Sequence, residues 1–115
     1  MALGFENKME IIEIMEGYLL NSRPPEEVRN KVDINYKIEG QSIIVFEISP
    51  VWNNPKKILT LGYAKATFVK NKNVWKIFWK RADNKWHSYK PTPIVGKLND
   101  FLKLVDRDEY GCFKG

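Results

Sequence analysis

The segment 79–91 holds the densest set of side chains that can do chemistry, including the chain's one histidine, His87. A histidine serves as a general base near neutral pH, and a nearby arginine such as Arg81 can hold a phosphate group. With Tyr89 to orient a proton, these are the parts of a small metal-independent ribonuclease. The competing interpretation is structural, because a lone histidine at a sheet edge commonly hydrogen-bonds to a neighbour such as Asp83. Both interpretations stay open at the level of the sequence.

Lysines alternate with apolar residues in segments 61–69 and 74–81, which this period of two predicts to be paired strands. A connecting loop of two or four residues pairs Phe68 with Ile77 or Trp75. In both registers one face is apolar and forms part of the core. The other face carries Tyr63, Lys65, Thr67, Val69, Lys76, Phe78 and Lys80.

This second face suits a nucleic acid, because lysines meet phosphates and aromatic rings stack on bases. The alternative is a solvated lysine face whose aromatic residues are present as strand formers. Our leading hypothesis is a small non-enzymatic binding module with an anionic partner such as nucleic acid. The predicted binding residues are Lys65, Lys76, Phe78, Lys80, Arg81, Trp86 and Tyr89.

The register of the first hairpin decides the role of Glu47. A three-residue connection pairs Ile38 with Ile44 and turns Glu47 outward as an ordinary exposed strand residue. A two-residue connection places Glu47 among Ile34 and Tyr36, where burial would make it a candidate catalytic acid. We favour the first register; the second would make Glu47 a catalytic candidate alongside His87 and Arg81.

The sequence predicts neither a metal site nor a cofactor. A single cysteine and a single histidine cannot build a structural zinc site within one chain. Asp106, Asp108 and Glu109 resemble the start of a calcium loop, but the later oxygen ligands and the glycine spacing are missing. Neither a glycine-rich phosphate loop nor a serine nucleophile elbow occurs.

Two amphipathic helices frame the strands. Apolar residues recur every three or four positions over residues 5–21, which predicts a helix that Pro24 and Pro25 end. Near the C-terminus, Thr92 is suited to cap a second helix with Pro93 at its first position. The apolar stripe of that helix is Ile94, Leu98, Phe101, Leu102 and Val105.

Alternating apolar and polar residues predict four strands and a short fifth one, at 32–38, 43–48, 61–69, 74–81 and 86–89. Residues 50–60 contain the turn signal Asn54-Pro55 and are predicted to form a loop. Short connections favour an antiparallel sheet, because parallel strands need long crossovers. The predicted fold class is α+β: an antiparallel meander of four to five strands with an N-terminal and a C-terminal helix, in a single domain of residues 1–115.

The composition is that of a globular domain with a concentrated positive charge. A length of 115 residues suits one domain, and 43% hydrophobic residues exclude a disordered chain. The net charge is +5, but residues 61–93 alone carry eight basic residues and one acidic residue, a net charge of +7. An anionic partner is therefore expected to bind the basic, aromatic hairpin within residues 61–93.

Other features bear on location and association. No apolar stretch approaches the roughly 20 residues of a membrane span, and the N-terminus lacks the apolar core of a signal peptide. Cys112 is the only cysteine, so an internal disulfide is excluded. We expect a cytoplasmic protein without a membrane partner. An isolated tryptophan such as Trp52 suits a protein contact, so a third hypothesis is an interaction protein or homodimer.

Motifs spread in order over nearly the whole chain also match a known pattern. They are Arg23-Pro24, residues 36–42, Phe46-Glu47, Pro50-Val51-Trp52, Ala64-Lys65, residues 75–79, 81–83 and 85–89, Pro91, Asp108 and residues 111–115. Together they resemble a bacterial family called domain of unknown function 3024. That family usually carries a tryptophan within its final Phe-x-Gly, where this chain has Lys114. The resemblance implies a small stand-alone cytoplasmic protein and points to no particular activity.

Overall fold

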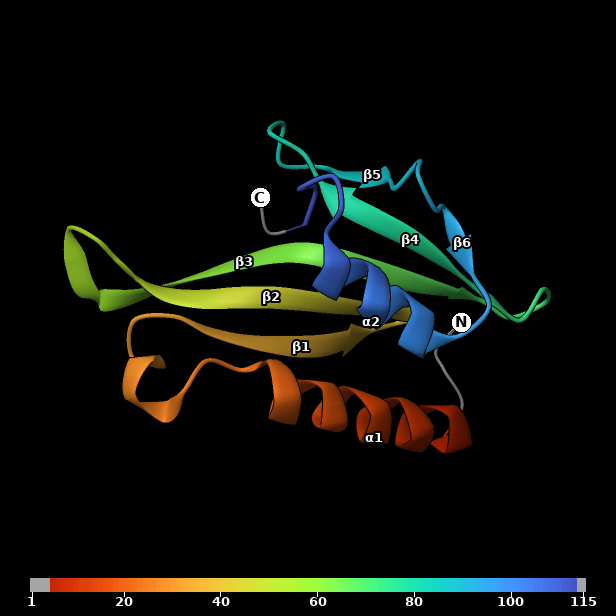
Figure 1. Ribbon diagram of the computed structural model, residues 1–115, viewed down its shortest axis with the longest axis horizontal. Helices are drawn as coiled ribbons and strands as arrows, with labels where there is room; N and C mark the ends of the chain where they lie inside the picture. Colours follow the sequence, from red (N-terminus) through yellow and green to blue (C-terminus); the bar gives the residue numbers. More distant parts are fainter. Residues whose placement is uncertain (1–4, 114–115) are drawn as a thin grey trace.

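The computed structural model describes residues 5–113 and shows an antiparallel sheet with helices on one side (Figure 1). Lys114, the departure from the family pattern, lies outside the described residues. The elements in chain order are α1 (Phe5–Ser22), the 3-10 turn η1 (Glu26–Val28), β1 (Asp33–Glu39), β2 (Ser42–Val51), β3 (Asn54–Val69), β4 (Val74–Lys80), β5 (Trp86–Ser88), β6 (Ile94–Val95) and α2 (Leu98–Arg107).

The strands form a meander in the order β1-β2-β3-β4-β5, with every pairing antiparallel. β6 pairs with β4 as well, beside Trp75 and Lys76, whereas β5 pairs with the other end of β4. The predicted α+β class and its two helices are confirmed. The hairpin between β3 and β4 adopts the four-residue loop, which pairs Phe68 with Trp75.

The core lies between the sheet and the two helices. α2 passes in front of the central strands, and α1 runs beside β1 (Figure 1). The largest fully buried side chains come from all of these elements: Met15, Ile43, Val45, Ile77, Phe101 and Val105. The hydroxyl of Tyr18 in α1 donates a hydrogen bond to a carboxylate oxygen of Asp106 in α2, at 3.1 Å. This bond ties the helices together above the sheet.

The favoured register of the first hairpin is wrong. Ile38 pairs with Ile43 and Ile34 pairs with Glu47, so the connection is the two-residue turn Gly40-Gln41. Gly40 adopts a φ of 61°, the positive value that tight hairpin turns require and that glycine reaches without steric cost. Glu47 nevertheless stays exposed.

The predicted loop at residues 50–60 is also wrong. β2 continues to Val51 and β3 begins at Asn54, so a long two-stranded ribbon replaces the loop. The prolines in this segment do not prevent pairing, because proline is tolerated at strand edges and strand ends.

The start of the second helix differs from the prediction as well. Ile94 belongs to β6, where it pairs with Lys76, and the helix begins at Leu98 after Lys97. The backbone N–H and C=O groups of residues 94–95 pair with the open edge of β4. These residues therefore stay extended, and the helix begins only at Leu98. Ile94 is consequently 49% exposed and does not belong to the apolar stripe of α2.

Candidate functional site: the uncovered face of the sheet

Within residues 5–113, no helix covers the face of the sheet opposite α1 and α2 (Figure 1). Ile77 and Trp79 of β4 pack toward the core, so their neighbours on the strand point the other way. Cross-strand partners share a face, which adds side chains from the adjacent strands. We call this surface the lysine face and define it by Lys37, Phe46, Lys65, Lys76, Phe78, Lys80 and Trp86.

The centre of the lysine face is hollowed, with a volume of about 490 Å³. Each of the strands β1 to β5 contributes to its lining. The lining residues are Lys37, Glu39, Ser42, Ile44, Phe46, Thr60, Gly62, Lys65, Lys80 and Trp86. A single sheet face therefore gathers cations and aromatic rings from segments far apart in the sequence.

Trp86 reaches from its own position in β5 across β4 to β3. A Cβ atom placed on Gly62 of β3 would lie 3.2 Å from the indole carbon Cζ2 of Trp86 and 3.2 Å from Cγ2 of Ile44. Such contacts are tighter than ordinary van der Waals packing, so the absence of a side chain at Gly62 lets the indole rest against β3. Ile44, on the neighbouring strand β2, is only 8% exposed.

Lysine ammonium groups lie over the aromatic rings. The Nζ atom of Lys65 is 5.6 Å from the ring centroid of Phe78 and 5.7 Å from that of Trp86. The Nζ atom of Lys80 is 5.1 Å from the Trp86 centroid. A cation–π contact at an exposed site is worth about 0.5–1 kcal/mol. That is weak enough for a phosphate to draw these ammonium groups away from the rings.

The charge of the lysine face is only partly neutralised. Lys37 forms an ion pair with Glu39 at 3.3 Å, and both side chains are exposed. In the part of the chain that the structure describes, no carboxylate lies within ion-pair distance of Lys65, Lys76 or Lys80. The face thus keeps a positive potential that attracts anions.

His87 lies on the other side of the sheet. His87 pairs with Trp79 across β5 and β4, and the Arg81 guanidinium lies 5.5 Å from the Trp79 ring centroid. Because consecutive strand residues alternate, His87 and Trp86 point to opposite faces. The structure places His87 on the opposite face, while Arg81, with its guanidinium near Trp79, lines a hollow that Lys80 also borders.

His87 forms the hydrogen bond that the structural interpretation expected. Its Nε2 atom is 2.8 Å from Oδ2 of Asp83, whose Oδ1 accepts the backbone N–H of Lys85 at 2.9 Å. The Lys85 N–H and then the His87 ring lower the pKa of the Asp83 carboxyl below its usual value. Both side chains of the His87–Asp83 pair are partly exposed, at 36% and 47%.

A family profile described as a domain of unknown function, DUF3024, matches residues 4–115. The chain belongs to this family. The resemblance noted from the sequence motifs is thereby confirmed. Comparisons with curated proteins and with solved structures found no match.

Two aromatic residues of this DUF3024 domain lie away from the face expected for them. Tyr89 is 2% exposed and packs on the helix side, with its ring centroid 4.8 Å from that of Phe113. Tyr63 packs against the core because β3 has a register shift there: Val45 pairs with Ala64 but Phe46 pairs with Gly62. A bulge of this kind changes the direction in which a strand residue points. We therefore leave Tyr89 and Tyr63 out of the lysine face.

Glu47 and Arg81 meet in a hollow of about 270 Å³ that the sequence did not indicate. Tyr63 and Phe113 also line it. Burial, followed by the charge of Glu47, raises the pKa of the Tyr63 hydroxyl well above its usual value. His87 is not among the lining residues, so the base and the candidate acid do not share this hollow.

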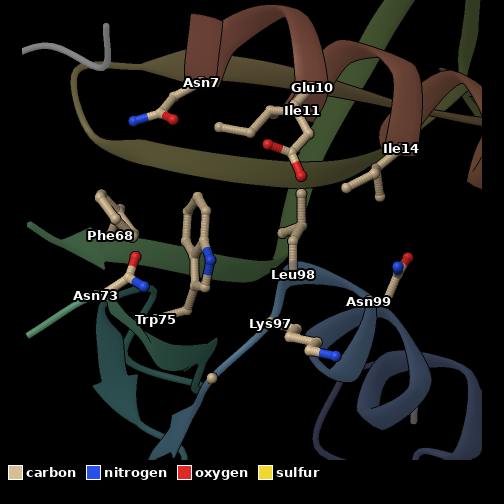
Figure 2. Close-up of a pocket in the computed structure, with 11 residues that line it drawn as sticks. Asn7, Glu10, Ile11, Ile14, Phe68, Asn73, Trp75, Lys97, Leu98 and Asn99 are labelled. Carbon is tan, nitrogen blue, oxygen red and sulfur yellow. The ribbon is translucent and has the colours of Figure 1, made fainter.

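A further pocket of about 370 Å³ lies where α1, the β3–β4 hairpin and the start of α2 meet (Figure 2). Trp75 and Leu98 point from two elements toward α1, where Ile11 and Ile14 complete the apolar wall (Figure 2). Its polar lining residues are Asn7, Glu10, Asn73, Lys97 and Asn99. Sequence patterns carry no signal for this pocket, because packing between distant segments creates it.

No helix among the described residues is long and apolar enough to cross a membrane.

Proposed function

We propose that this DUF3024 domain is a non-enzymatic module that binds single-stranded nucleic acid on the lysine face. The observation that carries the proposal is the position of Trp86, which rests against Gly62 with the ammonium groups of Lys65 and Lys80 over its ring. The cytoplasmic location expected from the sequence is consistent with such a partner.

An aromatic ring held on an open sheet is a stacking platform for an unpaired base. Stacking of one base on an aromatic side chain contributes about 1–3 kcal/mol and tolerates any base, because every base has a π-face. In our proposal a base stacks on Trp86, and Lys65 and Lys80 turn from the indole to the neighbouring phosphates. Counterions released from those phosphates add a favourable term that falls with rising salt.

Single strands fit this face better than a duplex does. The bases of a duplex are already stacked on each other, and its grooves admit a helix or a two-stranded ribbon rather than the broad face of a sheet. The cations of the face are all lysines, which contact phosphates rather than read base edges. We therefore propose binding with little sequence preference.

The placement of His87 supports binding without catalysis. A strand held on the lysine face lies on the opposite side of the sheet from the His87 imidazole, beyond the reach of proton transfer. Arg81 is likewise directed toward Trp79 rather than toward the lysine face.

The test is binding of labelled oligonucleotides by gel shift at low and moderate salt, with single- and double-stranded DNA and RNA. Changing Lys65, Lys76 and Lys80 together to glutamate should abolish binding. A control carries the same change of net charge at exposed lysines elsewhere: Lys31→Glu, Lys97→Glu and Lys103→Glu. Binding that persists in the first variant, or that disappears equally in the control, would contradict the proposal.

A second candidate function is cleavage of a phosphate ester such as RNA. The observation that favours it is the His87–Asp83 pair close to Arg81, because a carboxylate that bonds one ring nitrogen orients the imidazole as a base. Incubation of RNA with the wild type and with His87→Ala separates the two functions. Cleavage that is lost in His87→Ala identifies an enzyme; no cleavage, or unchanged cleavage, removes this candidate.

A further inference from the structure

The lysine face allows a bound strand to run along the β-strands or across them. Along β4 the face offers Lys76, Phe78 and Lys80 in alternation. Along β3 it leads into the ribbon formed by residues 49–61, which projects beyond both helices (Figure 1). We call this ribbon the arm; it carries further lysines, such as Lys57. The register of the sheet distinguishes these directions.

Cations of the lysine face lie in a row that crosses the strands. Lys37 of β1 pairs with Ile44 of β2, and Ile44 pairs with Lys65 of β3. Lys65 pairs in turn with Phe78 of β4, and Lys80 lies two residues further along that strand. Because cross-strand partners lie side by side on one face, Lys37 and Lys65 are two strand spacings apart, or about 10 Å. Lys37, Lys65 and Lys80 all line the hollow of the lysine face.

Aromatic rings form a second row beside the first. Phe46 lies two residues along β2 from Ile44 and pairs with Gly62 of β3. The indole of Trp86 rests against the same glycine, so both rings border one position of the sheet. Both also line the hollow. Two residues along a strand separate the row of rings from the row of cations, which is about 7 Å.

A single-stranded nucleic acid is also built in two rows, because its bases lie to one side of its phosphates. We propose that the bound strand crosses the sheet from β5 to β1, with bases over Trp86 and Phe46. Its phosphates then follow Lys80, Lys65 and Lys37. This path rests on the proposed function, and it adds Phe46 and Lys37 to the residues expected to bind.

A path along the β-strands would leave part of the hollow unused. Lys76 pairs with Thr67 of β3 and with Ile94 of β6, and it is not one of the described residues that line the hollow. A strand that follows β4 or the arm therefore reaches neither Phe46 nor Lys37. The path across the sheet uses the rings and the cations of the hollow together.

Glu39 opposes binding at the β1 end of this path. Its carboxylate lies 3.3 Å from the ammonium group of Lys37, and the two side chains are 64% and 58% exposed. An ion pair this exposed contributes little to stability, so a phosphate can replace the carboxylate. Glu39 also lines the hollow and brings a negative charge close to the phosphates. Glu39 thus competes with the nucleic acid for Lys37.

Anisotropy titration of a labelled oligothymidylate at several salt concentrations tests the path. Lys37→Gln should weaken binding and reduce the slope of log affinity against log salt by about 0.7, the value for one phosphate contact on a single strand. The controls Lys76→Gln and Lys57→Gln change the net charge equally, at exposed residues outside the path, and should keep the wild-type slope. An unchanged slope in Lys37→Gln, or an equal reduction in either control, would overturn the path.

Glu39→Gln gives a test in the opposite direction. It should raise the affinity by up to about fivefold, because Lys37 loses its competing partner. Damage to the fold does not produce such a gain. The control Glu13→Gln, at an exposed acid on α1, should bind as the wild type does. Equal affinities in Glu39→Gln and Glu13→Gln would show that Glu39 does not compete with the strand.

The ring row is tested by Phe46→Leu, which keeps an apolar side chain and removes the stacking surface. The affinity should fall about tenfold, the equivalent of one stacked base. The control Tyr110→Leu, at a ring 65% exposed near the C-terminus, should have no effect. Circular dichroism checks that both variants are folded. An unchanged affinity in Phe46→Leu would show that no base lies over this ring.

Oligonucleotide length separates the path from the proposed function itself. From β5 to β1 the path covers four strand spacings, or about 19 Å. Oligothymidylates too short to reach β1 should bind the wild type and Lys37→Gln equally, and longer ones should bind the variant less tightly. A wild type that binds no oligonucleotide contradicts the proposed function. A wild type that binds, with Lys37→Gln its equal at every length, contradicts the path alone.

Discussion

The Trp86 indole and the Gly62 backbone lie in contact across the lysine face, although the two residues belong to strands separated by β4. A Cβ atom at position 62 would lie 3.2 Å from the indole, closer than ordinary van der Waals packing. This contact holds the Trp86 ring against the sheet, where it is available for stacking.

Gly62→Ala should weaken nucleic-acid binding while the domain stays folded. The added Cβ forces Ile44 or the indole to move by a few tenths of an ångström, which costs about 1 kcal/mol of unfolding free energy. Displacement of the indole should lower the affinity for a single strand by less than the roughly tenfold loss that follows when one stacked base is lost entirely. Anisotropy titration and urea unfolding measure the two effects.

The matched control for this substitution is Gly17→Ala. A Cβ at Gly17 on α1 meets nothing within 4 Å. Alanine should stabilise the helix by about 0.5–1 kcal/mol and leave binding unchanged. An equal loss of affinity in both variants would show that Gly62 has no special role.

Asp33→Asn should destabilise the fold in a pH-dependent way. The guanidinium of Arg23, as the strongest cause, holds the pKa of the Asp33 carboxyl below its usual value of 3.8. A lowered pKa in the folded state adds stability above pH 3.8, and this stability is lost as the pH falls through the folded-state pKa. The urea midpoint of the variant should be lower than that of the wild type near neutral pH, and the difference should shrink in acid. A constant difference at all pH values would contradict this.

Alkaline pH should destabilise the fold through its buried tyrosines. Burial raises the pKa of Tyr36 to about 12 and raises the pKa of Tyr18 and Tyr63 well above the usual value of 10.0. Above pH 10.0 these phenols ionise in the unfolded chain before they ionise in the folded one, so stability falls as the pH rises. Thermal unfolding followed between neutral pH and strong alkali measures the loss.

Tyr18→Phe identifies the source of the alkaline effect. The variant loses the hydrogen bond to Asp106, so it should be less stable than the wild type near neutral pH. Its further loss of stability in alkali should be smaller, since one titrating group is gone. A variant that follows the wild-type profile in alkali would remove Tyr18 from the explanation.

The period of two predicted most of the lysine face. Alternation alone places Lys65, Phe78 and Lys80 on the side opposite Ile77 and Trp79, and the structure agrees. Tyr89 lies just beyond the end of β5 at Ser88, and its side chain packs on the helix side, away from that of Trp86.

Other features had no local signal. The bulge that turns Tyr63 toward the core depends on the packing of β2 against β3, and a sequence pattern does not contain it. The prolines at 50 and 55 indicated a loop, although edge positions tolerate them and the strands continue through the arm. The contact between Gly62 and Trp86 requires the folded sheet, since 24 positions of chain separate the two residues.

The central claim is tested most directly by titrating a labelled single-stranded oligonucleotide with the wild type, Trp86→Ala and the control Trp52→Ala. Trp52 supplies the same ring at the tip of the arm, away from the lysine face. Loss of one stacked base should raise the dissociation constant of Trp86→Ala about tenfold or more, and Trp52→Ala should bind as the wild type does. A wild type that binds no single strand, or a Trp86→Ala variant of unchanged affinity, would contradict the assignment of the lysine face.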